Sequence, residues 1–198
     1  MSALTELYQE IENCRDCELA KYRTNVVPGE GPEDSELLFI GEAPGWYEDQ
    51  QGRPFVGPAG AFLNQLLALI SLTRGQVYIA NVIKCRPPGN RDPLPAEIQA
   101  CHKWLDRQIE IICPRMIITL GRYSLARYFP NEAISKVHGK ARRAGDIICY
   151  PMYHPAAALH QGTLRQTIED DMLRIPQVLA QNEKIAETAV GSQQLNLL

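Results

Sequence analysis

The chain has 198 residues, of which 45% are hydrophobic and 22% are charged, which is typical of one globular domain and excludes two large domains. Its net charge of -3 argues against nucleic-acid binding, because a surface that follows phosphates needs Lys and Arg. The segment 84–143 nevertheless carries twelve Lys or Arg against five Asp or Glu, which is compatible with DNA docking on one face or with an unevenly charged, solvated surface.

The sequence contains no run of eighteen apolar residues. Residues 1–12 are acidic and amphipathic, whereas a secretion signal begins with basic residues and continues into an apolar block. We therefore expect a soluble, cytoplasmic protein.

Strand and helix patterns alternate along the chain. Short apolar runs bounded by Gly, Pro or charged residues predict buried parallel strands, and helical periodicity separates them. The expected strands are 37–40, 77–83, 116–120 and 147–150, and the expected helices are 59–70, 95–112, 122–129 and 164–179. This order predicts a three-layer α/β domain over residues 1–181. Residues 182–198 are polar and predict a flexible tail.

Polar and glycine-rich segments follow the expected strands. The sequence 41–45 (GEAPG) comes after the first strand, Asn81 lies near the end of the second, and His154 follows the last. In α/β folds ligands bind beyond the carboxyl ends of the strands, so these segments predict a site at one rim of the sheet.

Four of the six cysteines form a pattern. Cys14 and Cys17 have CxxC spacing, and fifteen residues separate Cys85 from Cys101. Thiols of a reducing compartment favour metal binding over disulfides, and these four could complete one shell around zinc or a [4Fe-4S] cluster, or remain four unconnected buried thiols. The two remaining cysteines adjoin apolar runs and are expected in the core: Cys113 and Cys149.

Four motifs, in order, closely resemble those of the family 4 uracil-DNA glycosylases, and the resemblance covers about residues 14–174. It implies an αβα fold with a central four-stranded parallel sheet, and excision of uracil from DNA in base excision repair. It also implies a [4Fe-4S] cluster on Cys14, Cys17, Cys85 and Cys101. The motifs are 41–45 (GEAPG) followed by Glu48 and Asp49, then 52–60 (GRPFVGPAG), 81–88 (NVIKCRPP) and 154–157 (HPAA).

An enzyme of this class must flip the base out, stack its ring and read its edge. Phe55 is the expected stacking platform, with a plain hydrophobic plug as the alternative. Asn81 can accept from uracil N3-H and donate to O4, a pattern that cytosine reverses. The resemblance gives Glu48 the task of crowding the position of thymine's methyl group, although from the sequence alone a surface carboxylate is the better reading. Gly41 and Ala43 are also expected to line the uracil site.

Bond cleavage leaves negative charge on uracil, which a donor must stabilise. His154 is the candidate donor to uracil O2, and a neutral imidazole suffices; a structural histidine is the alternative. In the wider superfamily a carboxylate after the first strand handles water, and here Ala43 stands at that position. Glu42 and Asn90 are the remaining polar candidates, coupled by a hydrogen bond, with Glu42 in a supporting role. Backbone carbonyls are also able to position water.

The basic segment 136–143 is expected to contact DNA phosphates, with a solvated hairpin as the alternative. Leu159, in the loop 156–162, resembles the wedge that fills the vacated base stack. The basic side chains expected to contact DNA are Lys136, Lys140, Arg142 and Arg143.

The last five residues resemble the glutamine-leucine peptide by which bacterial repair proteins dock on the sliding clamp. Gln194 would supply polar specificity, and Leu195, Leu197 and Leu198 would fill an apolar pocket.

Two other functions remain. A uracil-DNA binding or cross-linking protein of the same superfamily captures the sugar with a loop histidine after the second strand, but residues 86–95 contain none, so we favour turnover. A zinc-stabilised binding module without catalysis would be colourless, whereas an iron-sulfur protein is brown. We expect a monomer.

Overall fold

The computed structural model describes residues 2–145 and 147–194, with side chains as far as residue 181. Strands in this part of the chain form one sheet, in the order β2-β1-β3-β5-β4. The four strands β1, β2, β3 and β5 run parallel, and β4 pairs antiparallel with β5 at one edge. Their bounds are β1 Leu37–Gly41, β2 Tyr78–Asn81, β3 Met116–Leu120, β4 Arg142–Ala144 and β5 Ile147–Met152.

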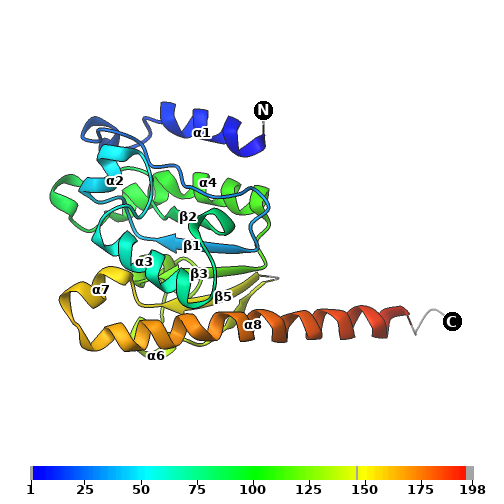
Figure 1. Cartoon of the computed structure of the whole chain (residues 1–198). Coiled ribbons are helices and arrows are strands. Elements are labelled where there is room, and N and C mark those ends of the chain that lie inside the picture. Colours follow the sequence, from blue (N-terminus) through cyan, green and yellow to red (C-terminus); the bar gives the residue numbers. More distant parts are fainter. Residues whose placement is uncertain (1, 146, 195–198) are drawn as a thin grey trace.

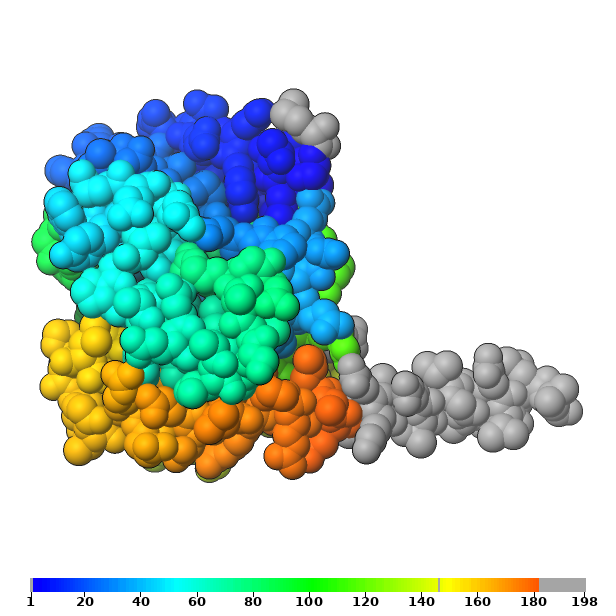
Figure 2. Space-filling model, viewed as in Figure 1, coloured from blue at the N-terminus to red at the C-terminus, as the bar shows by residue number. Residues whose placement is uncertain are grey.

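Helices cover both faces of the sheet (Figure 1). The α-helices are α1 Ala3–Asn13, α2 Trp46–Gln51, α3 Pro58–Leu69, α4 Pro95–Ile112, α5 Arg122–Ala126, α6 Ile134–Val137, α7 Pro155–His160 and α8 Thr163–Gln194. Short 3-10 turns are η1 Glu18–Lys21, η2 Arg74–Gln76 and η3 Pro88–Asn90. Figure 2 shows the layers filled with side chains, from the N-terminal segment (blue) through α2 and α3 (cyan) to α7 and α8 (yellow and orange).

The two faces of the sheet carry separate cores because successive strand residues point to opposite sides. In β1, Phe39 packs with α3 and α8, whereas Leu38 and Ile40 pack with α1 and α4. All five residues of β1 are buried, which explains its uninterrupted apolar sequence. The three-layer αβα architecture is therefore confirmed.

The strand count differs from the expected four. The additional strand, β4, lies at the edge and consists of Arg142, Arg143 and Ala144, none of which is fully buried. A three-residue polar edge strand has no apolar pattern to reveal it. The strand forms because these residues pair antiparallel with β5.

Two further expectations need correction. The helix expected over 164–179 is α8, which begins at Thr163 and continues to Gln194. Cys113, expected in the core, is exposed, because it ends α4 in a left-handed conformation (φ 47°) and its thiol donates to the Glu110 carbonyl. Cys149 is buried in β5, as expected. In the described residues no helix is both long and apolar enough to span a bilayer.

Candidate active site

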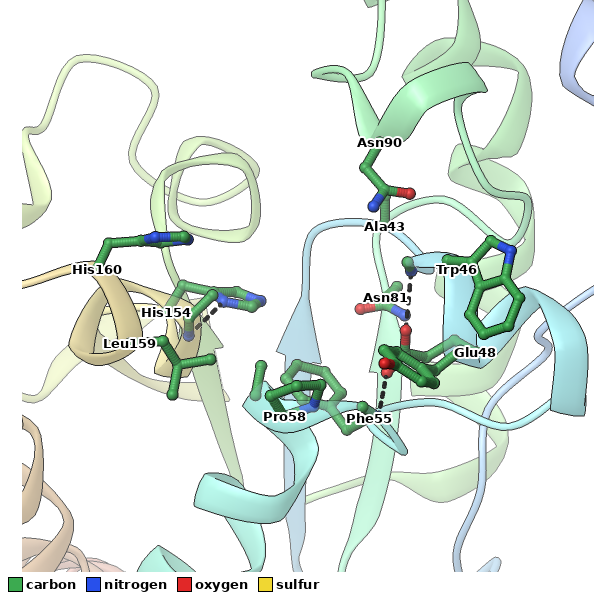
Figure 3. Close-up of a pocket in the computed structure, with 15 residues that line it drawn as sticks. Ala43, Trp46, Glu48, Phe55, Pro58, Asn81, Asn90, His154, Leu159 and His160 are labelled. Atoms are coloured by element: carbon green, nitrogen blue, oxygen red, sulfur yellow. Dashed lines mark hydrogen bonds between the residues drawn. The ribbon is translucent and has the colours of Figure 1, made fainter.

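A cavity of about 350 Å³ lies beyond the carboxyl ends of β1, β2 and β5. It brings together side chains from segments far apart in the sequence, at the rim where the parallel strands end (Figure 3). Sequence-predicted residues in its lining are Ala43, Glu48, Phe55, Asn81, Asn90, His154 and Leu159. Gly41 lies directly behind it, and Glu42 lines a neighbouring cavity.

Phe55 is 5% exposed and forms the wall of the cavity nearest the α3 core. Its ring stacks on the His154 imidazole, with centroids 5.5 Å apart and planes inclined by 26°. Phe55 has a left-handed backbone (φ 51°), and a Cβ on Gly60 would lie 1.8 Å from its carbonyl oxygen. Only glycine at position 60 permits this turn, and the turn directs the ring into the cavity.

Asn81 ends β2 beside Gly41 of β1, and only 2% of it is exposed. A Cβ on Gly41 would lie 2.4 Å from Asn81 Oδ1 and 2.6 Å from Phe55 Cζ, so glycine lets the amide and the ring approach each other. The Asn81 carbonyl accepts a hydrogen bond of 2.9 Å from the buried Lys84 ammonium. The backbone of Asn81 is thus held from behind, and the residue lines the cavity.

Glu48 bridges two loops of the site. Its carboxylate accepts backbone N-H bonds from Val56 and Gly57, both 2.9 Å, and from Gly45 at 3.1 Å. The N-terminus of α2 is thereby tied to the loop that carries Phe55. Glu48 is therefore a structural anchor whose carboxylate also lines the cavity.

His154 caps the N-terminus of α7, where its Nδ1 accepts from the Ala156 N-H at 3.1 Å. Burial lowers the pKa of His154 to about 4, against a smaller opposing effect of the Glu48 carboxylate. The ring is therefore neutral at pH 7. Since Nδ1 is the acceptor, the single proton resides on Nε2, which is left as a donor.

The two candidates for handling water occupy a second cavity of about 350 Å³, which shares Ala43 and His154 with the first. Burial raises the pKa of Glu42, with a further increase from Asp92. The hydrogen bond expected between Glu42 and Asn90 is not formed in the described structure. Asn90 Oδ1 instead accepts from Arg86 Nε at 2.6 Å, because a left-handed turn (φ 55°) points the side chain back along its own loop.

The four cysteines of the motif surround one apolar cavity. Cys14 ends α1, Cys17 precedes η1, Cys85 follows β2, and Cys101 lies on α4. Two N-H groups point at sulfur: Arg23 Nη1 lies 3.0 Å from Cys85 Sγ, and the Lys84 amide lies 3.2 Å from Cys101 Sγ. Among the described residues, no three His, Cys, Asp or Glu side chains converge closely enough to hold a single metal ion.

The basic segment lies beside the rim. The Gly139 N-H bonds the Pro151 carbonyl near the end of β5, and the His138 ring lies 4.8 Å from that of Tyr153. Lys136, Lys140 and Arg143 are exposed, whereas Arg142 is committed to an ion pair with Glu132. Leu159, on α7, is 49% exposed at the cavity.

The sequence patterns did not single out Trp46 and Tyr47, two half-exposed aromatic residues that also line the cavity. Their position in the sequence could have indicated this role. They directly follow the glycine-rich segment after the first strand, where two consecutive aromatic residues are not expected to be buried in the core. The expected clamp peptide is outside the described side chains. Leu195, Leu197 and Leu198 are not described, and only the backbone of Gln194 is.

Comparison with known proteins identifies relatives over most of the chain. A family model described as the uracil DNA glycosylase superfamily matches residues 28–174. The type-4 uracil-DNA glycosylase of Sulfurisphaera tokodaii is 48% identical over 185 residues, covering 88% of this chain and 84% of the relative. Those of Saccharolobus solfataricus and Archaeoglobus fulgidus are 45% and 44% identical, covering 91% and 92% of this chain and 88% and 96% of the relatives.

Proposed function

The chain belongs to the uracil-DNA glycosylase superfamily, among its type-4 members, and from that premise we propose that the cavity of Phe55, Asn81 and His154 holds a flipped-out uracil. The chain acts as a uracil-DNA glycosylase in DNA repair, hydrolysing the N-glycosyl bond of uracil in DNA. The observation that carries the proposal is that three residues from distant segments line one cavity.

Recognition uses the edge and the face of the base. Phe55 stacks on the ring, while the Asn81 amide accepts from N3-H and donates to O4. Cytosine offers an acceptor and a donor in the opposite places, so its binding would leave buried polar groups unpaired. We assign to Glu48, which three backbone N-H groups hold in place, the task of excluding the methyl group of thymine.

Catalysis depends on stabilising the departing uracil anion. We assign this task to the Nε2-H of neutral His154, which donates to O2 as charge develops there. Ala43 offers no carboxylate to a water molecule. Glu42 and Asn90 therefore position water from the adjoining cavity, independently of each other, with Glu42 in a supporting role.

We propose that the cysteine cavity holds a [4Fe-4S] cluster, because its donor set suits one. Cys14, Cys17, Cys85 and Cys101 supply four thiolates, and the N-H groups of Arg23 and Lys84 reach two of the sulfurs. We propose that the cluster is structural and cross-links the N-terminal segment to β2 and α4. Purified protein should be brown, whereas a colourless preparation with stoichiometric zinc would contradict the assignment.

Single-turnover excision tests the site. Folded wild-type protein should release uracil from an oligonucleotide with one U, so that alkali breaks the strand there. His154→Ala should lower the rate about 100-fold or more, as loss of an oxyanion donor does, and Asn81→Ala roughly 5- to 150-fold, as loss of a buried hydrogen bond does. Asn131→Ala, on an exposed loop, is the control.

Two results would contradict the site assignment: wild-type rates in both variants, or no uracil release by folded protein that holds its iron. A protein-DNA adduct that persists in a denaturing gel would instead support capture over turnover.

DNA docking extends beyond the cavity. We propose that Lys136, Lys140 and Arg143 contact phosphates beside the rim, that Arg142 contributes less because Glu132 neutralises it, and that Leu159 fills the vacated stack. The protein would act as a monomer, which size-exclusion chromatography with light scattering checks.

We further propose that residues 194–198 bind the sliding clamp. Deleting them should abolish clamp binding while leaving excision intact. Unchanged clamp affinity in the truncated protein would discard this interaction.

A further inference from the structure

Large apolar side chains gather around the mouth of the uracil cavity. Trp46, Tyr47 and Leu159 are each about half-exposed, and all three line this cavity. In Figure 3, Trp46 stands across the cavity from Leu159 and His160, with Phe55 between the two sides. Uracil recognition uses Phe55, Asn81 and His154 and leaves Trp46 and Tyr47 without a task. An exposed apolar group next to a binding site indicates a further contact surface.

The two aromatic rings are held in place by each other and by the loop that follows. They are the first two residues of α2, and their centroids lie 5.1 Å apart in an edge-to-face arrangement with planes at 85°. Tyr47 also packs on Gly57, where an added Cβ would lie 3.0 Å from its ring. Trp46 is thus supported from one side and open on the other.

Hydrogen bonds to two adjacent residues in the middle of the short helix fix its position. At its start, the Glu48 carboxylate accepts from the Gly45 N-H and from the neighbouring loop. Farther along, the buried Asp49 carboxylate accepts from the N-H groups of Thr24 and Asn25. Because both anchors are made by adjacent residues of α2, the indole is presented to solvent at a defined position.

The polar groups of Trp46 and Tyr47 are also available to a ligand. Within the described part of the chain, neither the Trp46 indole N-H nor the Tyr47 hydroxyl hydrogen-bonds to the protein, so neither side chain is there to complete an internal network. An indole with an open face is a general platform for a nucleobase, and such stacking contributes about 1–3 kcal/mol per base.

We propose that Trp46, supported by Tyr47, stacks on the base of the nucleotide adjacent to the flipped uridine in the same DNA strand; this rests on the proposed function of the cavity. A strand whose uridine enters the cavity must leave across its rim. The neighbouring base has then lost a stacking partner, and the indole replaces it.

Fluorescence tests the contact directly. The chain has two tryptophans, and Trp104 is buried, so quenching of the exposed Trp46 reports on its surroundings. The probe is a single-stranded oligonucleotide with one 2′-fluoro-2′-deoxyuridine, which resists hydrolysis. It should quench wild-type protein and Trp104→Phe but not Trp46→Phe. Trp46→Ala should bind the probe roughly 5- to 150-fold more weakly, and Leu173→Ala, equally exposed on α8, should bind normally.

A second probe identifies the occupant. Replacing the nucleotide beside the uridine with an abasic residue, on one side and then the other, should weaken wild-type binding at one position and leave Trp46→Ala unchanged there. Binding by Trp46→Ala within twofold of wild type, or equal loss in both proteins, would overturn the inference. Failure of wild-type protein to excise uracil would instead refute the proposed function. Circular dichroism verifies that each variant is folded.

Discussion

Two glycines are as important to the cavity as the side chains that face it. Gly41 leaves room for the Asn81 amide and the Phe55 ring, and Gly60 leaves room for the Phe55 carbonyl. The left-handed backbone of Phe55 is tolerated because the surrounding bonds to Glu48 hold its loop. The shape of the cavity therefore depends on the missing Cβ atoms of Gly41 and Gly60 as well as on the side chains that line it.

Gly41→Ala should impair both excision and stability. The added methyl group would meet Asn81 Oδ1 at 2.4 Å and Phe55 Cζ at 2.6 Å, so both side chains must move. We expect uracil excision to fall about 100-fold, since a displacement of 1 Å can cost that much, and stability to fall by about 1–3 kcal/mol, as in other overpacked cores.

Gly75→Ala is the matched control, because a Cβ there would lie 4.0 Å from its nearest neighbour, Thr73 Oγ1. Excision kinetics and urea denaturation measure the two effects. Wild-type kinetics in Gly41→Ala would show that the amide and the ring need not lie so close.

The low pKa of His154 predicts a pH dependence of stability. Its pKa is about 4 when folded and 6.5 when unfolded, so as pH falls below 6.5 the unfolded chain takes up the proton first. The contribution of neutral His154 to the free energy of unfolding is therefore fully present above pH 6.5 and declines toward pH 4. Urea denaturation from pH 7 to pH 4.5 should show a steeper loss in wild type than in His154→Asn. Parallel curves would contradict the depressed pKa.

Between elements, a chain of buried polar groups joins α1 to the end of β2. The Tyr8 and Tyr78 hydroxyls lie 2.5 Å apart, and Gln108 Nε2 donates to Tyr78 and to the Pro28 carbonyl. Gln108 Oε1 accepts from Lys84 Nζ at 2.6 Å. Since Lys84 also bonds the Asn81 carbonyl, this network supports the backbone of Asn81 from the opposite side of the sheet.

Gln108→Leu should break this network. The variant leaves the buried Lys84 ammonium with one acceptor fewer and the Pro28 carbonyl without its donor, which should cost about 3 kcal/mol. Gln99→Leu, on the exposed face of α4, is the control and should cost little. Urea denaturation measures both, and equal stability of the two variants would exclude a supporting role for the network.

For the whole molecule, the cysteine cavity joins parts that are distant along the chain. If this cavity holds the proposed [4Fe-4S] cluster, oxidising and chelating its iron should bleach the visible colour and free the N-terminal segment, so that trypsin cleaves at Lys21 or Arg23. We expect the Tm to fall by about 10 °C, from the loss of a cross-link worth a few kcal/mol. Cys17→Ser should behave likewise, and Cys113→Ser, exposed at the end of α4, should not. An unchanged cleavage pattern after bleaching would argue against a structural cluster.

Local sequence patterns were sufficient for the central architecture. The runs 37–40 and 116–120 predicted β1 and β3 nearly to the residue, and 95–112 predicted α4, because an element buried on a fixed face must repeat apolar residues at its own period. The motif residues around Asn81 and His154 predicted a rim site for the same reason: strand ends are visible in the sequence. The family followed from the order of those motifs.

Tertiary structure alone decided the rest. It formed the edge strand β4 from polar residues, exposed Cys113 at a helix end, and paired Asn90 with Arg86 where Glu42 was expected. It also placed Trp46 at the cavity mouth. These outcomes depend on how the loops bring distant segments together. A sequence pattern indicates whether a segment is buried, but it does not indicate which other segment it contacts.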